Sequence, residues 1–160
     1  AGDGGWRTMG RMTHFMIRPA RVTEAQGVLD LWREAGALPS RTDNPAEVRR
    51  LVRRHPGTLL VAAEGRRLVG TVIAGWDGWR GGIYRLAVVP DRRRRGLARA
   101  LIAAAERRIA AQGGRRISAM VVRAERHAVG FWNRAPGWRR ARHMDRYVRM
   151  VKGRRMTKPR

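Results

Sequence analysis

Residues 84–98 read YRLAVVPDRRRRGLA, and this stretch predicts a strand, a turn and a helix in close succession. Apolar and β-branched residues run from Ile83 to Val89 and stop at Pro90, as in a buried strand that leads into a turn. Four arginines follow, and Gly96 then precedes a stretch of helical periodicity over Leu97–Gln112. The segment therefore predicts a strand–turn–helix unit with a strongly basic turn.

The turn of this unit has the features of an anion-binding site. The first N–H groups of a helix have no partner within the helix, and the helix dipole adds positive potential there. Gly96 has no side chain to keep a pyrophosphate away from the backbone, and Ala98 is small where the helix passes the ligand. The arginines at 92–95 add positive charge. A turn with solvated arginines explains the same residues, so both interpretations stay open at this point.

Outward from this unit, the hydrophobic periodicity predicts an α/β fold with a mixed sheet. Strands are expected at residues 15–18, 58–64, 67–76, 83–89 and 117–122, with a closing hairpin over 138–142 and 144–151. Helices are expected at residues 25–35, 45–54, 97–112 and 124–134. Thr23 and Asn44 are the expected N-caps of the first two helices. We expect one domain at 15–151, between a flexible leader at 1–14 and a basic tail at 152–160.

The composition excludes several classes of site. Cysteine is absent from the 160 residues, which excludes disulfides, thiolate metal sites and a cysteine nucleophile. No stretch is apolar for long enough to cross a membrane, and no signal-peptide pattern opens the sequence. We therefore expect a cytoplasmic protein with no membrane partner and no metal.

The formal charge of +24 has two interpretations. The cations are almost all arginine, with Lys152 and Lys158 the only lysines, and GC-rich codons favour such a composition. On this view the arginines cover solvated faces. Alternatively, the positive field attracts nucleic acid or another polyanion, which it must do at low salt. Charge alone does not distinguish the two.

Two patterns in the sequence are more specific. The residues VxPxxRxxGxA at 88–98 resemble motif A of the GCN5-related N-acetyltransferase (GNAT) family, and AxxFWxxxxGW at 128–138 resembles another of its segments. The strand pair at 61–70 also resembles one in the family. The turn at 77–81, with Leu31 and Trp32, is similar to that of small bacterial members that include ribosomal-protein acetyltransferases. The resemblance covers residues 15–150. It implies the GNAT fold, a mostly antiparallel central sheet splayed between two strands and flanked by helices.

The same resemblance implies a function and a set of ligands. A member of this family transfers the acetyl group of acetyl-CoA, its cosubstrate, directly to an amine of a small molecule, a protein N-terminus or a lysine. Homodimers are common in the family, so a homodimer is compatible with the resemblance. Carried over by motif position, the pyrophosphate loop is Arg93, Arg94, Arg95, Gly96, Leu97 and Ala98, and the pantetheine strand is Leu86, Ala87 and Val88.

The sequence departs from the family where the proton transfers take place. Trp132 stands at the place of a tyrosine that often protonates the departing thiolate, and an indole N–H is not a useful acid. We therefore expect Trp132 to pack along the pantetheine. Tyr84, on the motif strand, is a candidate catalytic residue, although it and Tyr147 are more simply structural. The candidate bases are Glu125, Asp77, Glu64 and His127, of which Glu125 is the best placed in the motif.

Two other classes of function stay open from the sequence. One is a catalytically weak acyl-CoA-binding module, because Trp132 and Glu125 replace the usual residues. The other is a nucleic-acid-binding protein, which the charge and the six tryptophans favour. Against the latter, the sequence contains no recognition motif for nucleic acid.

Overall fold

Residues 14–121 are built around a five-stranded sheet with the strand order β1-β2-β3-β4-β5. The computed structural model describes residues 14–146, 148 and 149, so the expected leader and tail lie outside the described residues except for His14. The chain divides into two compact units, one that ends at Val121 and one that begins at Val122. The strands of the first unit are β1 (Met16–Pro19), β2 (Leu59–Glu64), β3 (Arg67–Trp76), β4 (Gly81–Val88) and β5 (Ile117–Ala119).

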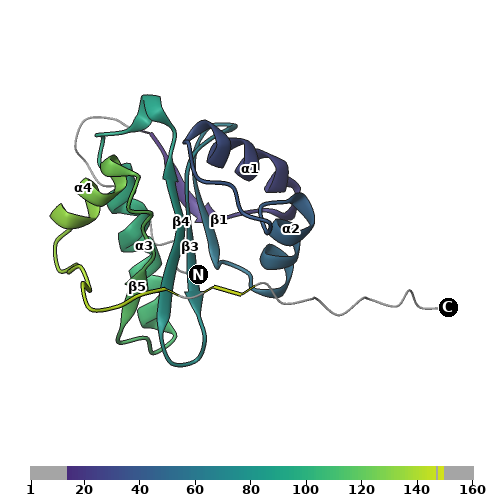
Figure 1. Ribbon diagram of the computed structural model, residues 1–160. Helices are drawn as coiled ribbons and strands as arrows, with labels where there is room; N and C mark the ends of the chain where they lie inside the picture. The colour runs from purple at the N-terminus through teal and green to yellow at the C-terminus, as the bar shows by residue number, and fades with distance from the viewer. Residues whose placement is uncertain (1–13, 147, 150–160) are drawn as a thin grey trace. The chain divides into compact units, whose positions relative to one another are not determined.

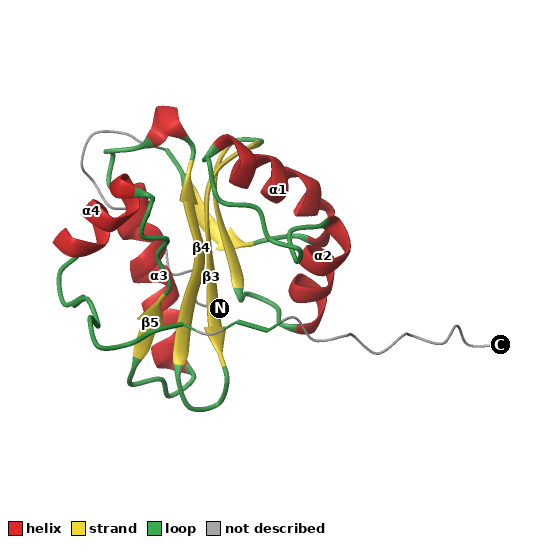
Figure 2. Cartoon of the chain, in the orientation of Figure 1, coloured by secondary structure: helices red, strands yellow, loops and turns green. Residues whose placement is uncertain are grey.

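The sheet is antiparallel from β1 to β4, and β5 is parallel to β4 (Figure 2). The pairing of β4 with β5 ends at Ile83 and Ala119, whereas β4 continues to Val88 along β3. The last five residues of β4 therefore have no partner strand on the β5 side in the described part of the chain. This arrangement confirms the predicted α/β fold with a mixed sheet that opens beside β4.

Helices cover both faces of the sheet. Helices α1 (Ala25–Glu34) and α2 (Pro45–Arg54) lie on one face, and α3 (Leu97–Ala111) lies on the other (Figure 1). The expected N-terminus of α2 is confirmed, because Asn44 Oδ1 accepts a hydrogen bond of 3.0 Å from the Glu47 N–H. Helix α1 begins differently, because a 3₁₀ turn, η1 (Val22–Glu24), contains Thr23 and precedes the helix. The prediction that Thr23 caps α1 was wrong.

The long helix α3 packs closely on the sheet. Its buried side chains form one stripe, Leu97, Leu101, Ile102, Ala105 and Ile109. A Cβ atom at Gly70 of β3 would lie 2.9 Å from Leu101 Cδ1, so only glycine permits this approach. The close packing fixes the start of α3 relative to the C-terminal end of β4.

The second unit contains helix α4 (Arg126–Arg134) and no strand among its described residues. Strand β5 is shorter than predicted, because it ends at Ala119 and not at residue 122. The predicted closing hairpin is wrong for residues 138–142, and part of its second arm lies outside the described residues. These residues are mostly exposed and rich in arginine, so they lack the alternating apolar face that stabilises a strand.

Candidate functional site

The turn between β4 and α3 exposes the N-terminus of α3. A 3₁₀ turn, η2 (Pro90–Arg92), follows β4, and Gly96 is the N-cap of α3 with φ of 80°. This left-handed conformation is easy only for glycine. No side chain caps the helix, and a Cβ atom at Gly96 would meet nothing within 4 Å. The start of α3 therefore has no side-chain cap, and the Cβ position of its N-cap residue is open.

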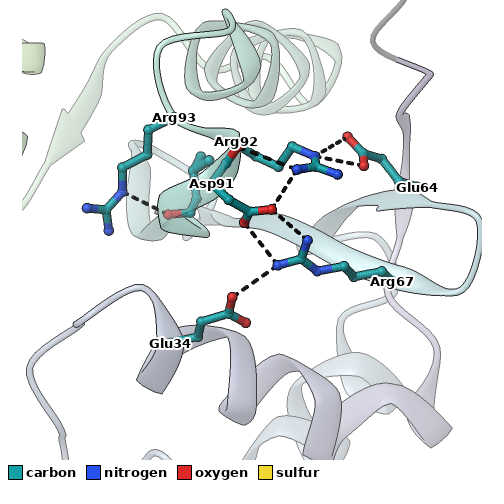
Figure 3. A network of polar contacts seen from close by, with 7 residues as sticks. Glu34, Glu64, Arg67, Asp91, Arg92 and Arg93 are labelled. Carbon is teal, nitrogen blue, oxygen red and sulfur yellow. Dashed lines mark hydrogen bonds and ion pairs between the residues drawn. The ribbon is translucent and has the colours of Figure 1, made fainter.

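The four arginines of this turn have different environments, and Figure 3 shows two of them, Arg92 and Arg93. Arg92 Nε donates to both carboxylate oxygens of Glu64, at 2.9 and 2.8 Å. Arg93 Nε donates to the Val88 carbonyl at 3.1 Å, and its Nη2 donates to the Ala35 carbonyl at 2.8 Å. The side chain of Arg93 is thus directed toward the protein, and its backbone N–H donates to the Pro90 carbonyl at 3.3 Å. Arg94 and Arg95 are exposed and bind no other described residue.

An ion-pair network holds the base of the turn. Arg67 of β3 donates to Asp91 Oδ2 and Oδ1, at 2.8 and 3.0 Å, and to Glu34 Oε1 of α1 at 3.0 Å (Figure 3). Arg92 Nη1 donates to Asp91 Oδ2 at 2.6 Å. The Arg67 guanidinium holds the pKa of Asp91 below its usual range. The network therefore connects the end of α1, the β2–β3 hairpin and the basic turn.

These environments predict different effects on stability for two arginines of the same turn. Arg93→Ala leaves the Val88 and Ala35 carbonyls without their donor, so we expect the free energy of unfolding to fall by about 1–3 kcal/mol. Arg95→Ala removes an exposed side chain without a described partner and is expected to change it by less than about 0.5 kcal/mol. Urea unfolding of both variants measures the difference. Equal stability of the two variants would contradict the assigned environments.

Strand β4 contains an irregularity just before its open edge. Ala87 pairs with Thr71 and Tyr84 pairs with Ile73, so Arg85 and Leu86 together face one residue of β3, as in a β-bulge. Arg85 has φ of 49°, a conformation that costs a non-glycine residue about 1–2 kcal/mol. The bulge reorients the strand between Tyr84 and Leu86.

The edge of β4 beyond the bulge has no partner strand on the β5 side among the described residues. The Val89 N–H donates to the Val69 carbonyl of β3 at 3.1 Å. Because N–H groups alternate along a strand, the Val88 N–H points to the opposite side, where the pairing with β5 has already ended. Leu86–Val88 therefore form a backbone edge without a described partner strand, which leads to the turn between β4 and α3. One group of this edge is occupied, because the Val88 carbonyl accepts from Arg93 Nε.

The comparisons with known proteins agree with this arrangement. A family model described as the acetyltransferase (GNAT) family matches residues 25–138.

The chain belongs to the GNAT family of acetyltransferases.

Individual relatives support the same assignment. An acetyltransferase of Pectobacterium atrosepticum is 37% identical over 105 residues, which are 66% of this chain and 74% of the relative. The aminoglycoside acetyltransferase AAC(6')-Iy, solved with the bisubstrate analogue CoA-S-monomethyl-acetylneamine, has a TM-score of 0.67 at 19% identity and covers 87% of this chain and 100% of its own. Ribosomal-protein-alanine N-acetyltransferase of Brucella melitensis has a TM-score of 0.65 at 17% identity, with coverage of 86% and 99%. The two solved structures share the fold, and the family makes this GNAT protein an acyltransferase.

The second unit of the GNAT protein contains two of the predicted site residues. Glu125 is the N-cap of α4, is half-buried, and makes no capping hydrogen bond with its side chain. Its carboxylate binds no other described residue. Trp132 lies in α4 and makes edge-on contacts with Phe131 and Trp138, with ring centroids 5.6 and 4.6 Å apart. Trp132 is thus part of an aromatic cluster within this unit.

Two of the other candidate bases, Asp77 and Glu64, are engaged elsewhere in the GNAT protein. Asp77 Oδ1 accepts hydrogen bonds from the Arg80 and Trp79 N–H groups, at 2.6 and 2.8 Å, and these bonds lower its pKa. A carboxylate with a lowered pKa is a weaker base, and Asp77 serves as a turn residue. Glu64 is paired with Arg92, and His127 is exposed. Of these candidates, Glu125 alone combines partial burial with a carboxylate that has no described partner.

Tyr84 lies across two glycines of the sheet. A Cβ atom at Gly82 would come within 2.7 Å of the Tyr84 hydroxyl, so the glycine leaves room for the ring. The side chain is 43% exposed, which keeps it a candidate for contact with a substrate. The described residues contain no group of histidine, cysteine and carboxylate side chains that suits a metal ion. No helix in the described ranges is long and apolar enough to cross a membrane.

The sequence-based set of site residues did not include Arg85. Its left-handed backbone and its partners come from the bulge and from segments distant in sequence. An arginine inside an apolar strand pattern was the one available signal, and it resembles an ordinary solvent-facing position.

Proposed function

We propose that the chain is an N-acetyltransferase that moves the acetyl group of acetyl-CoA directly to an amine. The Gly96 turn carries the proposal, because it presents uncapped helix N–H groups, open space at the glycine and two unpaired arginines in one place. This combination fits a pyrophosphate, which needs several donors and close backbone approach.

The proposed cofactor contacts follow the open edge and the turn. The N–H groups of Leu97 and Ala98, with the backbone of Gly96, would hold the pyrophosphate, and the side chains of Arg94 and Arg95 would add charge. Arg93 would shape the turn, because its N–H and its side chain already bind protein carbonyls. The backbone of Leu86–Val88 would pair with the pantetheine amides, because it has no partner strand on that side. Trp132 would pack along the pantetheine, as the family motif implies for its position.

The proposed reaction needs no covalent enzyme intermediate. The neutral amine nitrogen attacks the thioester carbonyl, the C–S bond breaks, and the CoA thiolate leaves and takes up a proton. A backbone N–H of β4 stabilises the negative charge that develops on the carbonyl oxygen. Glu125 accepts the proton that the amine loses, directly or through water. Its unpaired carboxylate supports this role.

The acceptor class is tested with a panel of amines. The names of two fold relatives suggest an aminoglycoside such as neamine and a peptide with N-terminal alanine, to which we add a peptide with a lysine side-chain amine. Release of free CoA from acetyl-CoA, corrected for hydrolysis, measures transfer to each amine. We expect turnover with at least one member of the panel. A folded protein that binds acetyl-CoA and acetylates none of them would favour a binding module over an enzyme.

Polyanion binding is a separate proposal with a weaker basis. Arg49, Arg53 and Arg54 of α2 are exposed and form no ion pair within the described residues. Together with the charge of +24, they favour attraction of polyanions at low salt. Such attraction is screened at physiological ionic strength, so we expect it to be non-specific.

A further inference from the structure

The side chain of Arg85 joins strand β4 to the loop at residues 36–44, between α1 and α2. Its Nη1 donates to the Leu38 carbonyl at 2.9 Å, and its Nη2 forms an ion pair with the Asp43 carboxylate. The guanidinium carbon lies 5.0 Å from the centroid of the Trp32 ring. The side chain is only 20% exposed. Arg85 therefore holds the loop by two of its nitrogens at once.

The peptide group of Arg85 is held as firmly as its side chain. Its carbonyl accepts a hydrogen bond of 2.9 Å from Thr71 Oγ1, and Thr71 Oγ1 accepts one of 2.9 Å from the Trp32 indole N–H. Thr71 is fully buried. These buried hydrogen bonds hold the left-handed backbone of Arg85, and residues in such conformations gather at functional positions. A glycine would adopt this backbone at no cost, so the arginine side chain is what the position requires.

The same carboxylate that binds Arg85 also organises the loop. Asp43 Oδ2 accepts a hydrogen bond of 2.7 Å from the Ser40 N–H. Leu38, whose carbonyl Arg85 holds, has its apolar side chain 53% exposed. The loop thus presents an exposed leucine beside β4 while its backbone is tied to the strand.

The position of Arg85 along β4 relates the held loop to the proposed cofactor site. Leu86–Val88 lie between Arg85 and the residues that lead to the Gly96 turn. A strand advances about 3.3 Å per residue, so these three residues span about 10 Å. If the pyrophosphate lies at that turn and the pantetheine along Leu86–Val88, the reactive end of the cofactor lies near Arg85. This step rests on the proposed function. The segment that Arg85 holds borders that end of the strand on the α1 side of the sheet.

We propose that Arg85 is a positioning residue that fixes loop 36–44 as one wall of the acceptor subsite, with Leu38 as its contact to the acceptor. The arginine does not touch the reacting atoms. It acts through the loop, so its loss is expected to affect the binding of the amine and not that of acetyl-CoA.

Two variants release the loop by different routes. Arg85→Gly removes the contacts with Leu38 and Asp43, and glycine tolerates the left-handed backbone at this position. Asp43→Asn removes the ion pair but keeps a side-chain oxygen that can accept from the Ser40 N–H. We expect kcat/KM for the best amine of the panel to fall about tenfold through a higher KM, with the acetyl-CoA Kd changed less than about twofold. The exposed pair of Asp30 and Arg33 on α1 provides the matched controls, Asp30→Asn and Arg33→Gln. These controls should change neither kcat/KM for the amine nor the Kd of acetyl-CoA.

A second readout needs neither substrate. Arg41 is exposed within the loop, so trypsin can cleave after it once the loop is released. We expect the fragment that ends at Arg41 to form about tenfold faster in both loop variants than in the parent and the controls, as measured by mass spectrometry. Parent values of KM and cleavage rate in Arg85→Gly and Asp43→Asn would overturn the proposal, as would a loss confined to kcat. Failure of the parent to bind acetyl-CoA would instead refute the proposed function. The cleavage rates would still test whether Arg85 and Asp43 hold loop 36–44 in place.

Discussion

Replacing Gly96 with valine is expected to weaken acetyl-CoA binding about 30-fold or more, because charge-assisted hydrogen bonds worth about 2 kcal/mol are lengthened or lost. A Cβ atom at Gly96 would have no other atom within 4 Å, so the valine side chain would fill the space proposed for the pyrophosphate. It would also disfavour the left-handed backbone that aims the N–H groups of α3 at the ligand. Isothermal titration with acetyl-CoA measures the loss.

The matched control for this variant is Gly113→Val. Gly113 lies just beyond the other end of α3, has φ of 91°, and likewise has nothing within 4 Å of an added Cβ atom. It therefore carries the same backbone strain without touching the basic turn. We expect Gly113→Val to lose stability and keep its affinity for acetyl-CoA. A folded Gly96→Val protein with parent affinity would place the cofactor elsewhere.

Replacing Glu125 with glutamine is expected to lower kcat near pH 7 about 100-fold, because glutamine cannot accept the proton of the attacking amine. The rate should recover partly at high pH, where more of the amine is already neutral. The choice of Glu125 follows from the engagement of Asp77 in its turn and of Glu64 with Arg92. The measurement is a pH–rate profile of the variant beside the parent and beside Glu47→Gln, whose carboxylate pairs with Arg50 on α2. A parent profile in Glu125→Gln would leave Glu125 a helix-end residue and make bulk water the proton acceptor.

Much of the fold is predictable because it is encoded locally. Pro90 and Gly96 mark the ends of the basic turn, and Asn44 with Pro45 marks the start of α2, since each acts on its own backbone. The limits of β5 are not encoded in this way. Its residues are β-prone as far as 122, but the strand ends where its pairing with β4 ends at Ala119. Strand length there is set by the partner strand and not by propensity.

The candidate site shows the same division between local and tertiary signals. The sequence indicated an anion-binding turn, since its glycine and helix start are neighbours in the chain. It could not distinguish Arg93 from Arg94 and Arg95, because the partner of Arg93 at Ala35 is 58 residues away. The role of Arg85 likewise depends on Leu38 and Asp43, more than 40 residues earlier in the chain. Identical side chains in one run thus acquire different roles only through tertiary contacts.

Binding of acetyl-CoA to the purified protein tests the central claim most directly. A ligand that binds only the folded state at 100 times its Kd adds about 2.7 kcal/mol of stability, which corresponds to a rise of roughly 5–10 °C in Tm for a chain of this size. S-Acetylpantetheine, which lacks the pyrophosphate, should shift the Tm far less, because it cannot use the Gly96 turn. We expect a saturable heat of binding and a Tm that rises with acetyl-CoA concentration. No heat and no shift at millimolar acetyl-CoA would contradict the account.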